Sequence, residues 1–154
     1  MKFTGKTDIN APLNATFGSF ADFESFERHA RRAGAEVQRI DDLVSPGPGM
    51  IWKVRAEVRG KPRKIEIELM DYDAPNALHF TATTTGYDAV IDVVLTPVTG
   101  RQTSASITVV VKPNTLAARL ILQSARLTKG TLNKRFRKGL QKFGKNMEDR
   151  IQSA

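Results

Sequence analysis

Alternating polar and apolar residues predict β-strands at the start and through the middle of the chain. Between Lys2 and Ile9, the side chains of Phe3, Thr7 and Ile9 fall on one side, as in a half-buried strand. A period of two returns from Ala35 to Pro113, where five clusters of Gly, Pro, Asn and Asp residues mark turns. This pattern predicts an antiparallel meander of six strands after the first strand.

The strand from Met50 to Val58 has the clearest alternation and places Trp52 and Val54 on its inward face. In the next strand, Lys64 to Tyr72, apolar residues alternate with charged residues that mark an outer surface. Three further strands follow, at 78–84, 87–98 and 103–112. The last two carry apolar residues in both phases in places, which leaves their facing open.

Two short helices are predicted between the first strand and the meander, and one long helix after it. Pro12 suits the first helical turn, and Asp22 is a good N-cap for the second helix. From Leu116 to Ile151 the apolar period is helical, which corresponds to a length of roughly 50 Å. Because glycine weakens a helix interior, we predict a break at Gly130.

These elements predict one α+β domain over residues 1–154, with the order β-α-α-β6-α. The only long amphipathic element must cover the apolar face of the sheet. We therefore expect a curved, seven-stranded antiparallel sheet wrapped around the C-terminal helix.

The net charge of +8 is concentrated at the end of the chain. Residues 1–111 contain 13 Lys/Arg and 14 Asp/Glu, whereas residues 112–154 contain 11 and 2. A solvated outer helix face explains this charge. The alternative is a surface for anionic lipid or another protein, because Leu116 to Leu127 is apolar on nearly every side; a homodimer contact is one such interaction. Nucleic acid is not expected, since no aromatic residues are interleaved for stacking.

The chemistry available to the chain is limited. It has no cysteine, and its two histidines, His29 and His79, have no metal-ligand spacing, so we expect no metal and no cofactor. The N-terminus has no signal-peptide pattern, which favours a cytoplasmic location. Asp92 is a candidate acid or polar anchor if it points into a cavity, and Tyr72 is a second candidate for proton transfer.

Four segments of the sequence resemble the START-like, helix-grip superfamily (SRPBCC proteins), which includes the pollen-allergen and polyketide cyclase/dehydrase groups. The resemblance covers nearly the whole chain, and residues 115–136 resemble a bacterial branch. It is carried by Ile9-Asn10-Ala11-Pro12, by residues 21–27, by Gly49-Met50-Ile51-Trp52 and by Lys112-Pro113.

This resemblance implies a cavity between the sheet and the C-terminal helix that binds or transports a lipid, quinone, polyketide or sterol-like molecule. A cyclase/dehydrase- or aromatase-type enzyme is the competing hypothesis, and a non-enzymatic binding protein is favoured over it. A third hypothesis is a membrane-surface or protein-interaction module without a cavity. The cavity lining that the resemblance implies consists of Phe17, Phe20, Trp52, Val54, Ile67, Leu69, Phe80 and Phe136.

Overall fold

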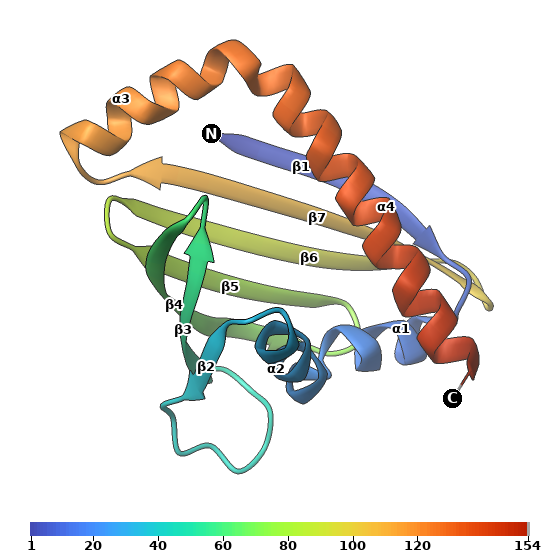
Figure 1. Cartoon of the computed structure of the whole chain (residues 1–154). Helices are drawn as coiled ribbons and strands as arrows, with labels where there is room; N and C mark the ends of the chain where they lie inside the picture. The colour runs from blue at the N-terminus through green and yellow to red at the C-terminus, as the bar shows by residue number, and fades with distance from the viewer. Residues whose placement is uncertain (154) are drawn as a thin grey trace.

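The computed structural model describes residues 1–153 and contains a seven-stranded antiparallel sheet with helices on one side (Figure 1). The strands lie in the order β1-β7-β6-β5-β4-β3-β2, so the first strand pairs with the last. The elements are β1 (Lys2–Ile9), α1 (Leu13–Phe20), α2 (Phe23–Arg32), β2 (Glu36–Arg39), β3 (Ile51–Val58), β4 (Lys61–Asp73), β5 (Ala77–Thr84), β6 (Tyr87–Thr99), β7 (Gln102–Pro113), α3 (Leu116–Ala125), a 3-10 turn (Arg126–Thr128) and α4 (Lys129–Ser153).

The strand register settles the facing that the sequence left open. Phe80 on β5 lies opposite Ile91 on β6, which lies opposite Val109 on β7. Since side chains alternate along each strand, the odd-numbered residues of β6 and β7 share the concave face with Phe80. Buried Val93 and Leu95 lie on that face, and the even-numbered residues of β6 form the outer one.

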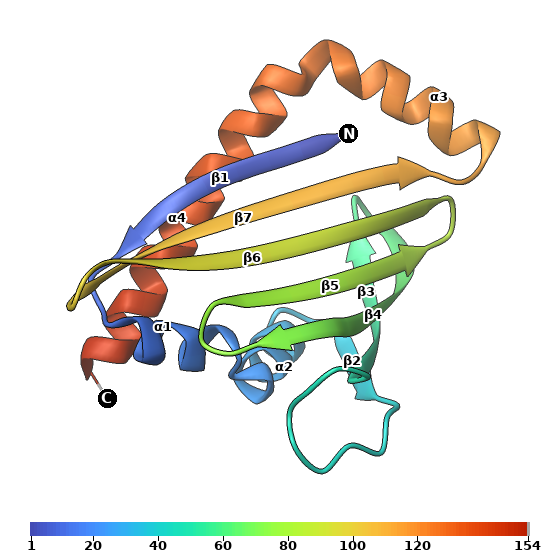
Figure 2. The ribbon, with the colours of Figure 1, turned by 180° about the vertical axis from the view of Figure 1, so that it is seen from behind.

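Helices α1 and α2 follow β1 directly and lie at one end of the concave face (Figures 1 and 2). The predicted N-cap is confirmed, because the Asp22 carboxylate accepts a hydrogen bond of 3.2 Å from the Ser25 backbone N–H. The C-cap of α2 is followed by Gly34, whose φ of +98° favours glycine. Phe17 of α1 and Phe23 of α2 pack against the sheet residues Tyr72 and Trp52, respectively.

The C-terminal helix is interrupted earlier than the sequence predicted. The break is the 3-10 turn at Arg126–Thr128, whereas Gly130 lies in the first turn of α4. Figure 1 shows that α3 and α4 meet at a marked angle, so that they form two arms instead of one rod. The helical content predicted for 116–151 and its interruption are both present, and only the predicted place of the break, Gly130, is wrong.

Close backbone approach joins α4 to β1. A Cβ atom at Gly144 would lie 2.8 Å from both γ atoms of Thr7, and one at Gly5 would lie 3.0 Å from Leu140 Cδ2. At the end of α4, Glu148 accepts a 2.6 Å hydrogen bond from the Asn10 backbone N–H. This bond, followed by the neighbouring Lys145 ammonium, lowers the pKa of Glu148. The contacts fix the C-terminal half of α4 against the first strand.

Candidate functional site

An apolar pocket of about 320 Å³ lies between α1, α2, the C-terminal half of α4 and the concave face of the sheet. Its floor contains apolar residues from every strand except β1: Val37, Trp52, Val54, Ile67, Leu78, Phe80, Ile91, Val93 and Ile107. Cross-strand pairs such as Trp52 with Ile67, and Phe80 with Ile91, align these side chains across the sheet. The antiparallel register therefore builds a continuous apolar floor.

Aromatic side chains form most of the pocket's helical wall. The Phe23 ring lies 5.3 Å from the ring of Trp52 and 6.2 Å from the ring of Phe80, measured between centroids. Phe143 on α4 closes the opposite side, with its ring 5.6 Å from Phe20 and 5.9 Å from Phe26. Edge and stacked contacts of this kind hold aromatic rings in defined orientations. The wall is thus shaped by helix–sheet packing.

Glu27 is the only charged residue among the residues that line this pocket. Its side chain is 12% exposed, and its Oε1 atom lies 3.7 Å from the Arg31 guanidinium one turn later on α2. The Arg31 side chain is 50% exposed and also donates a 2.9 Å hydrogen bond to the Val37 carbonyl. One polar pair therefore lies at the edge of an otherwise apolar space.

Five of the eight residues predicted as lining do line the pocket, and their role as ligand contacts stays a prediction: Phe20, Trp52, Val54, Ile67 and Phe80. The other three lie elsewhere. Phe17 packs edge-on against Tyr72, Leu69 is fully buried, and Phe136 lies beside Phe3 with 5.9 Å between ring centroids. Phe136 and Phe143 share one face of α4, and it is Phe143, two turns further along the helix, that lines the pocket. The prediction therefore chose the correct face of the helix and the wrong position along it.

Other pocket residues were missed for a specific reason. Ile91 and Val93 lie in a strand that is apolar in both phases, and only pairing with Phe80 and Leu78 identifies their facing. Phe23 and Phe26 lie three residues apart in the second predicted helix, a spacing that puts both on one helix face. That spacing is the signal that could have identified them, but the position of the helix over the sheet is a tertiary property.

Neither candidate for proton transfer lines the pocket. Asp92 lies on the outer face of the sheet, where its carboxylate contacts His79 Nδ1 and its side chain is 45% exposed. The condition for its predicted catalytic role is therefore not met. Tyr72 faces the concave side, where its ring packs edge-on against Phe17 at 5.3 Å. A strand bulge between Leu69 and Asp71 precedes it.

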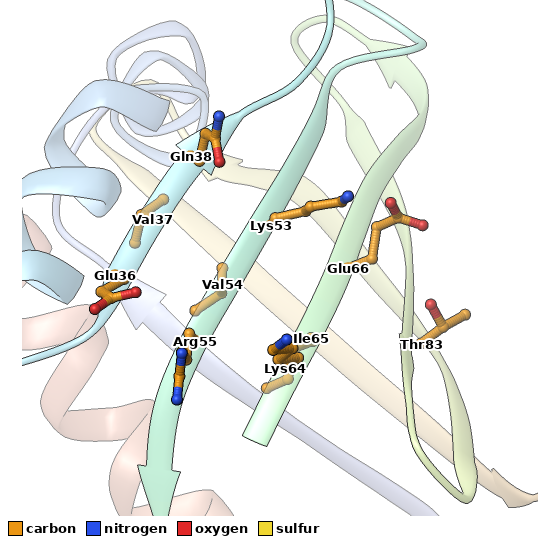
Figure 3. A pocket seen from close by; sticks show the side chains of 10 residues that line it. All are labelled: Glu36, Val37, Gln38, Lys53, Val54, Arg55, Lys64, Ile65, Glu66 and Thr83. Carbon is orange, nitrogen blue, oxygen red and sulfur yellow. The ribbon is translucent and has the colours of Figure 1, made fainter. Parts of the chain in front are cut away.

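A second depression, about 500 Å³ in volume, lies toward the β2 edge of the sheet and differs in character (Figure 3). It is lined mainly by polar and charged residues from β2, β3, β4 and β5. Lys53 pairs in register with Glu66, but Arg55 pairs with Lys64, so charges of like sign also lie side by side. An open, mixed-charge surface of this kind has no feature that selects a ligand.

The apolar concave face continues beyond the first pocket toward α3. A further pocket of about 360 Å³ includes Ile65, Ala82, Ala89 and Val111. Ile65, Ala82 and Ala89 each lie two residues along a strand from a floor residue of the first pocket. At its far end, Gly86 in the β5–β6 turn lies close to Ala118 of α3.

Within residues 1–153, no group of three or more acidic, histidine or cysteine side chains is arranged to hold a metal ion. Over the same residues, the structure has no helix with the length and apolar character needed to span a bilayer.

Comparison with known proteins gives a family and a fold. The family model described as "Polyketide cyclase / dehydrase and lipid transport" matches residues 1–148. A search of curated proteins found no match. Among solved structures, a protein from Thermus thermophilus, TTHA0849, has a TM-score of 0.66 at 16% identity, covering 99% of this chain and 98% of that one.

Two further structures bear names that describe a protein class. The Zhui aromatase/cyclase from Streptomyces sp. R1128 has a TM-score of 0.64 at 11% identity, with 87% of this chain and 89% of that chain covered. A START superfamily protein from Mycobacterium smegmatis has a TM-score of 0.58 at 9% identity, with coverages of 87% and 95%. These structural similarities confirm the predicted helix-grip fold, and the family match over residues 1–148 supports the assignment to the START-like, SRPBCC superfamily.

Proposed function

Because the chain belongs to the polyketide cyclase/dehydrase and lipid transport family, we propose that it binds and carries a small hydrophobic molecule in the pocket beneath α1 and α2. Lipids, quinones, polyketides and sterol-like molecules share the necessary chemistry, which is an apolar body with few polar groups. The observation that carries the proposal is the apolar lining of that pocket, with Glu27 as its only charged residue.

The pocket supports binding through burial of apolar surface. A volume of about 320 Å³ lies at the lower end of the range of roughly 300–1,000 Å³ typical of small-molecule sites. Burial of apolar surface contributes about 25 cal/mol per Å². An aliphatic or aromatic guest that replaces water on Phe23, Phe80 and Ile91 therefore gains affinity without needing hydrogen bonds.

The pocket edge defines how such a guest is oriented. A hydroxyl or amine on the ligand can donate a hydrogen bond to the Glu27 carboxylate, whereas an apolar chain has no polar group to satisfy deeper in the pocket. The Arg31 guanidinium, which is paired with Glu27, can donate hydrogen bonds to a carbonyl or an anionic group of the ligand. We therefore expect amphipathic ligands to keep their polar end at α2.

Carriage is preferred over catalysis because the two predicted proton-transfer residues lie outside the pocket, and the carboxylate that does line it, Glu27, is paired with Arg31 at the pocket edge. Asp92 is on the outer face and Tyr72 packs outside the pocket lining. The enzyme hypothesis would need a proton-transfer group within hydrogen-bonding reach of the substrate. Neither predicted candidate supports it.

The proposal is tested by filling the pocket from the α2 side. Ala30 lines the pocket, so Ala30→Phe places a ring in the space that the guest occupies. We expect this variant to weaken binding of the neutral fluorescent probe N-phenyl-1-naphthylamine by roughly ten-fold or more, since a well-packed ring excludes the guest. Fluorescence titration measures the change.

Ala33→Phe is the matched control, because Ala33 is exposed at the C-cap of the same helix and lies outside the lining. It should bind the probe as the wild type does. If the wild-type protein does not bind the probe, or if both variants bind it equally well, the pocket is not the binding site and the proposal is wrong.

A further inference from the structure

The outer face of α3 and of the 3-10 turn after it carries a ridge of exposed leucines that no other residue in 1–153 covers. Leu116, Leu120 and Leu127 are 71%, 57% and 88% exposed, and they recur at helical spacing on one side. The opposite side of α3 packs against the protein through buried Ala118 and half-buried Leu122. Large apolar side chains gathered at a protruding element mark an interaction site.

Positive charge surrounds this leucine ridge. Between Leu116 and Met147 the chain has nine Lys/Arg residues and no Asp/Glu. Arg119 and Arg126 lie next to the leucines on the helical wheel, about 60–80° from Leu116. Among the residues that the structure describes, only Lys145 of these nine takes part in an ion pair. The arm formed by α3 and the start of α4 therefore presents an unneutralised cationic rim around an apolar ridge.

We propose that α3 docks on an anionic lipid surface, with the leucine ridge inserted among the acyl chains and the arginines at the headgroups. Interfacial helices combine an apolar face with a basic flank in this way. A second copy of the chain fits the ridge less well, because an α3–α3 contact would bring two such cationic arms together.

Helix α3 lies at one end of the apolar concave face. Ala118 lies next to Gly86, at the end of the apolar pocket that contains Ala89 and Val111. From there the apolar concave face leads through Ile91 to the pocket beneath α2. Because the leucine ridge lies on the opposite side of α3 from Ala118, a docked membrane would lie near this end of the concave face with α3 between the two. Any transfer of a guest from there rests on the proposed function; the docking itself does not depend on ligand binding.

Co-sedimentation with vesicles tests the docking. Wild-type protein should sediment with vesicles of phosphatidylcholine and phosphatidylglycerol, sediment far less with phosphatidylcholine alone, and be released by salt. The double variants L120S/L127S and R119Q/R126Q should each weaken vesicle binding by roughly ten-fold or more, because one removes apolar insertion and the other removes attraction to headgroups.

Matched controls carry the same changes elsewhere. Val44 and Val98 are also highly exposed, and Lys53 and Lys64 are exposed on the outer face of the sheet, so V44S/V98S and K53Q/K64Q should bind vesicles as wild type does.

The proposal is overturned if the leucine variant retains full binding, if the wild type does not bind anionic vesicles, or if sedimentation velocity shows a dimer that only L120S/L127S dissociates. All variants should still bind the probe in the α2 pocket. If the wild type does not bind the probe, the carrier function is refuted and the membrane docking is not.

Discussion

Replacing Asp41 with alanine is expected to lower the free energy of unfolding by about 3 kcal/mol, because hydrogen bonds to a buried charged group are strong and their loss leaves the partners unpaired. The Asp41 side chain is 6% exposed and pairs with the Arg39 guanidinium. It also accepts hydrogen bonds from the Leu43 and Ile51 backbone N–H groups at 3.0 and 2.9 Å. Asp41 therefore joins the loop after β2 to the start of β3, and it holds Arg39, whose Cζ lies 5.9 Å from the Trp52 ring centroid.

Asp42→Ala is the matched control, since Asp42 is exposed and a surface change of this kind usually alters stability by less than about 0.5 kcal/mol.

The hydrogen bond from Arg39 is the largest cause of the lowered pKa of Asp41. Since the folded-state pKa is depressed, the stability contributed by Asp41 is complete above the unfolded value of about 3.9 and decreases as the pH falls below it. Urea unfolding at pH 7 and pH 3 should show the gap between wild type and Asp41→Ala narrowing; a gap independent of pH would contradict the assignment.

Two glycines of α4 should respond to alanine with opposite signs. At Gly144, an added Cβ would lie 2.8 Å from Thr7 Cγ2 and Oγ1, so Gly144→Ala must push α4 away from β1 and is expected to destabilise the protein by about 1–3 kcal/mol. At Gly139 nothing lies within 4 Å, so Gly139→Ala should stabilise the helix by about 0.5–1 kcal/mol. Thermal unfolding of the two variants measures both changes.

The Gly144 substitution should also disturb the pocket, because Phe143 precedes it and lines the wall. We expect Gly144→Ala to weaken probe binding, while Gly139→Ala leaves it unchanged. Combining Gly144→Ala with Thr7→Ala, which removes both opposing γ atoms, should recover part of the lost stability. Equal stability changes at the two glycines would show that α4 does not approach β1 as closely as the structure has it.

The fold could be predicted because its signals are local. Alternation in Lys2–Ile9 and Met50–Val58, the Asp22 cap and the turn clusters each depend on a few neighbouring residues. The break in the C-terminal helix was predicted at Gly130 because residues 126–128 contain no glycine or proline, whereas the structure has it at Arg126–Thr128. Its position depends on how α3 packs on β7 and how α4 packs on β1.

The site was predicted less completely, because its members meet only in the tertiary structure. Trp52, Val54 and Ile67 were identified from clean alternation in two strands. Asp92 was a candidate only if it pointed into a cavity, because apolar neighbours on both sides hid its phase; register with His79 places it outside. A pattern along one strand does not give the register between strands, so only the structure could decide this condition.

Some predictions from the sequence stay predictions. These are the cytoplasmic location, the absence of a cofactor, the lack of nucleic-acid binding, the homodimer contact and the preference among lipid, quinone, polyketide and sterol-like ligands. The pocket chemistry favours hydrophobic guests as a class.

The central claim is that a hydrophobic guest enters the concave pocket, and methyl NMR with bound N-phenyl-1-naphthylamine tests it most directly. Intermolecular nuclear Overhauser effects should connect the probe to the methyl groups of Ile91, Val93 and Ile107, which line the pocket, and not to those of Val90 and Val94 on the outer face. Contacts with Val90 and Val94 alone, or no contacts with any of the pocket methyls at saturating probe, would contradict the account.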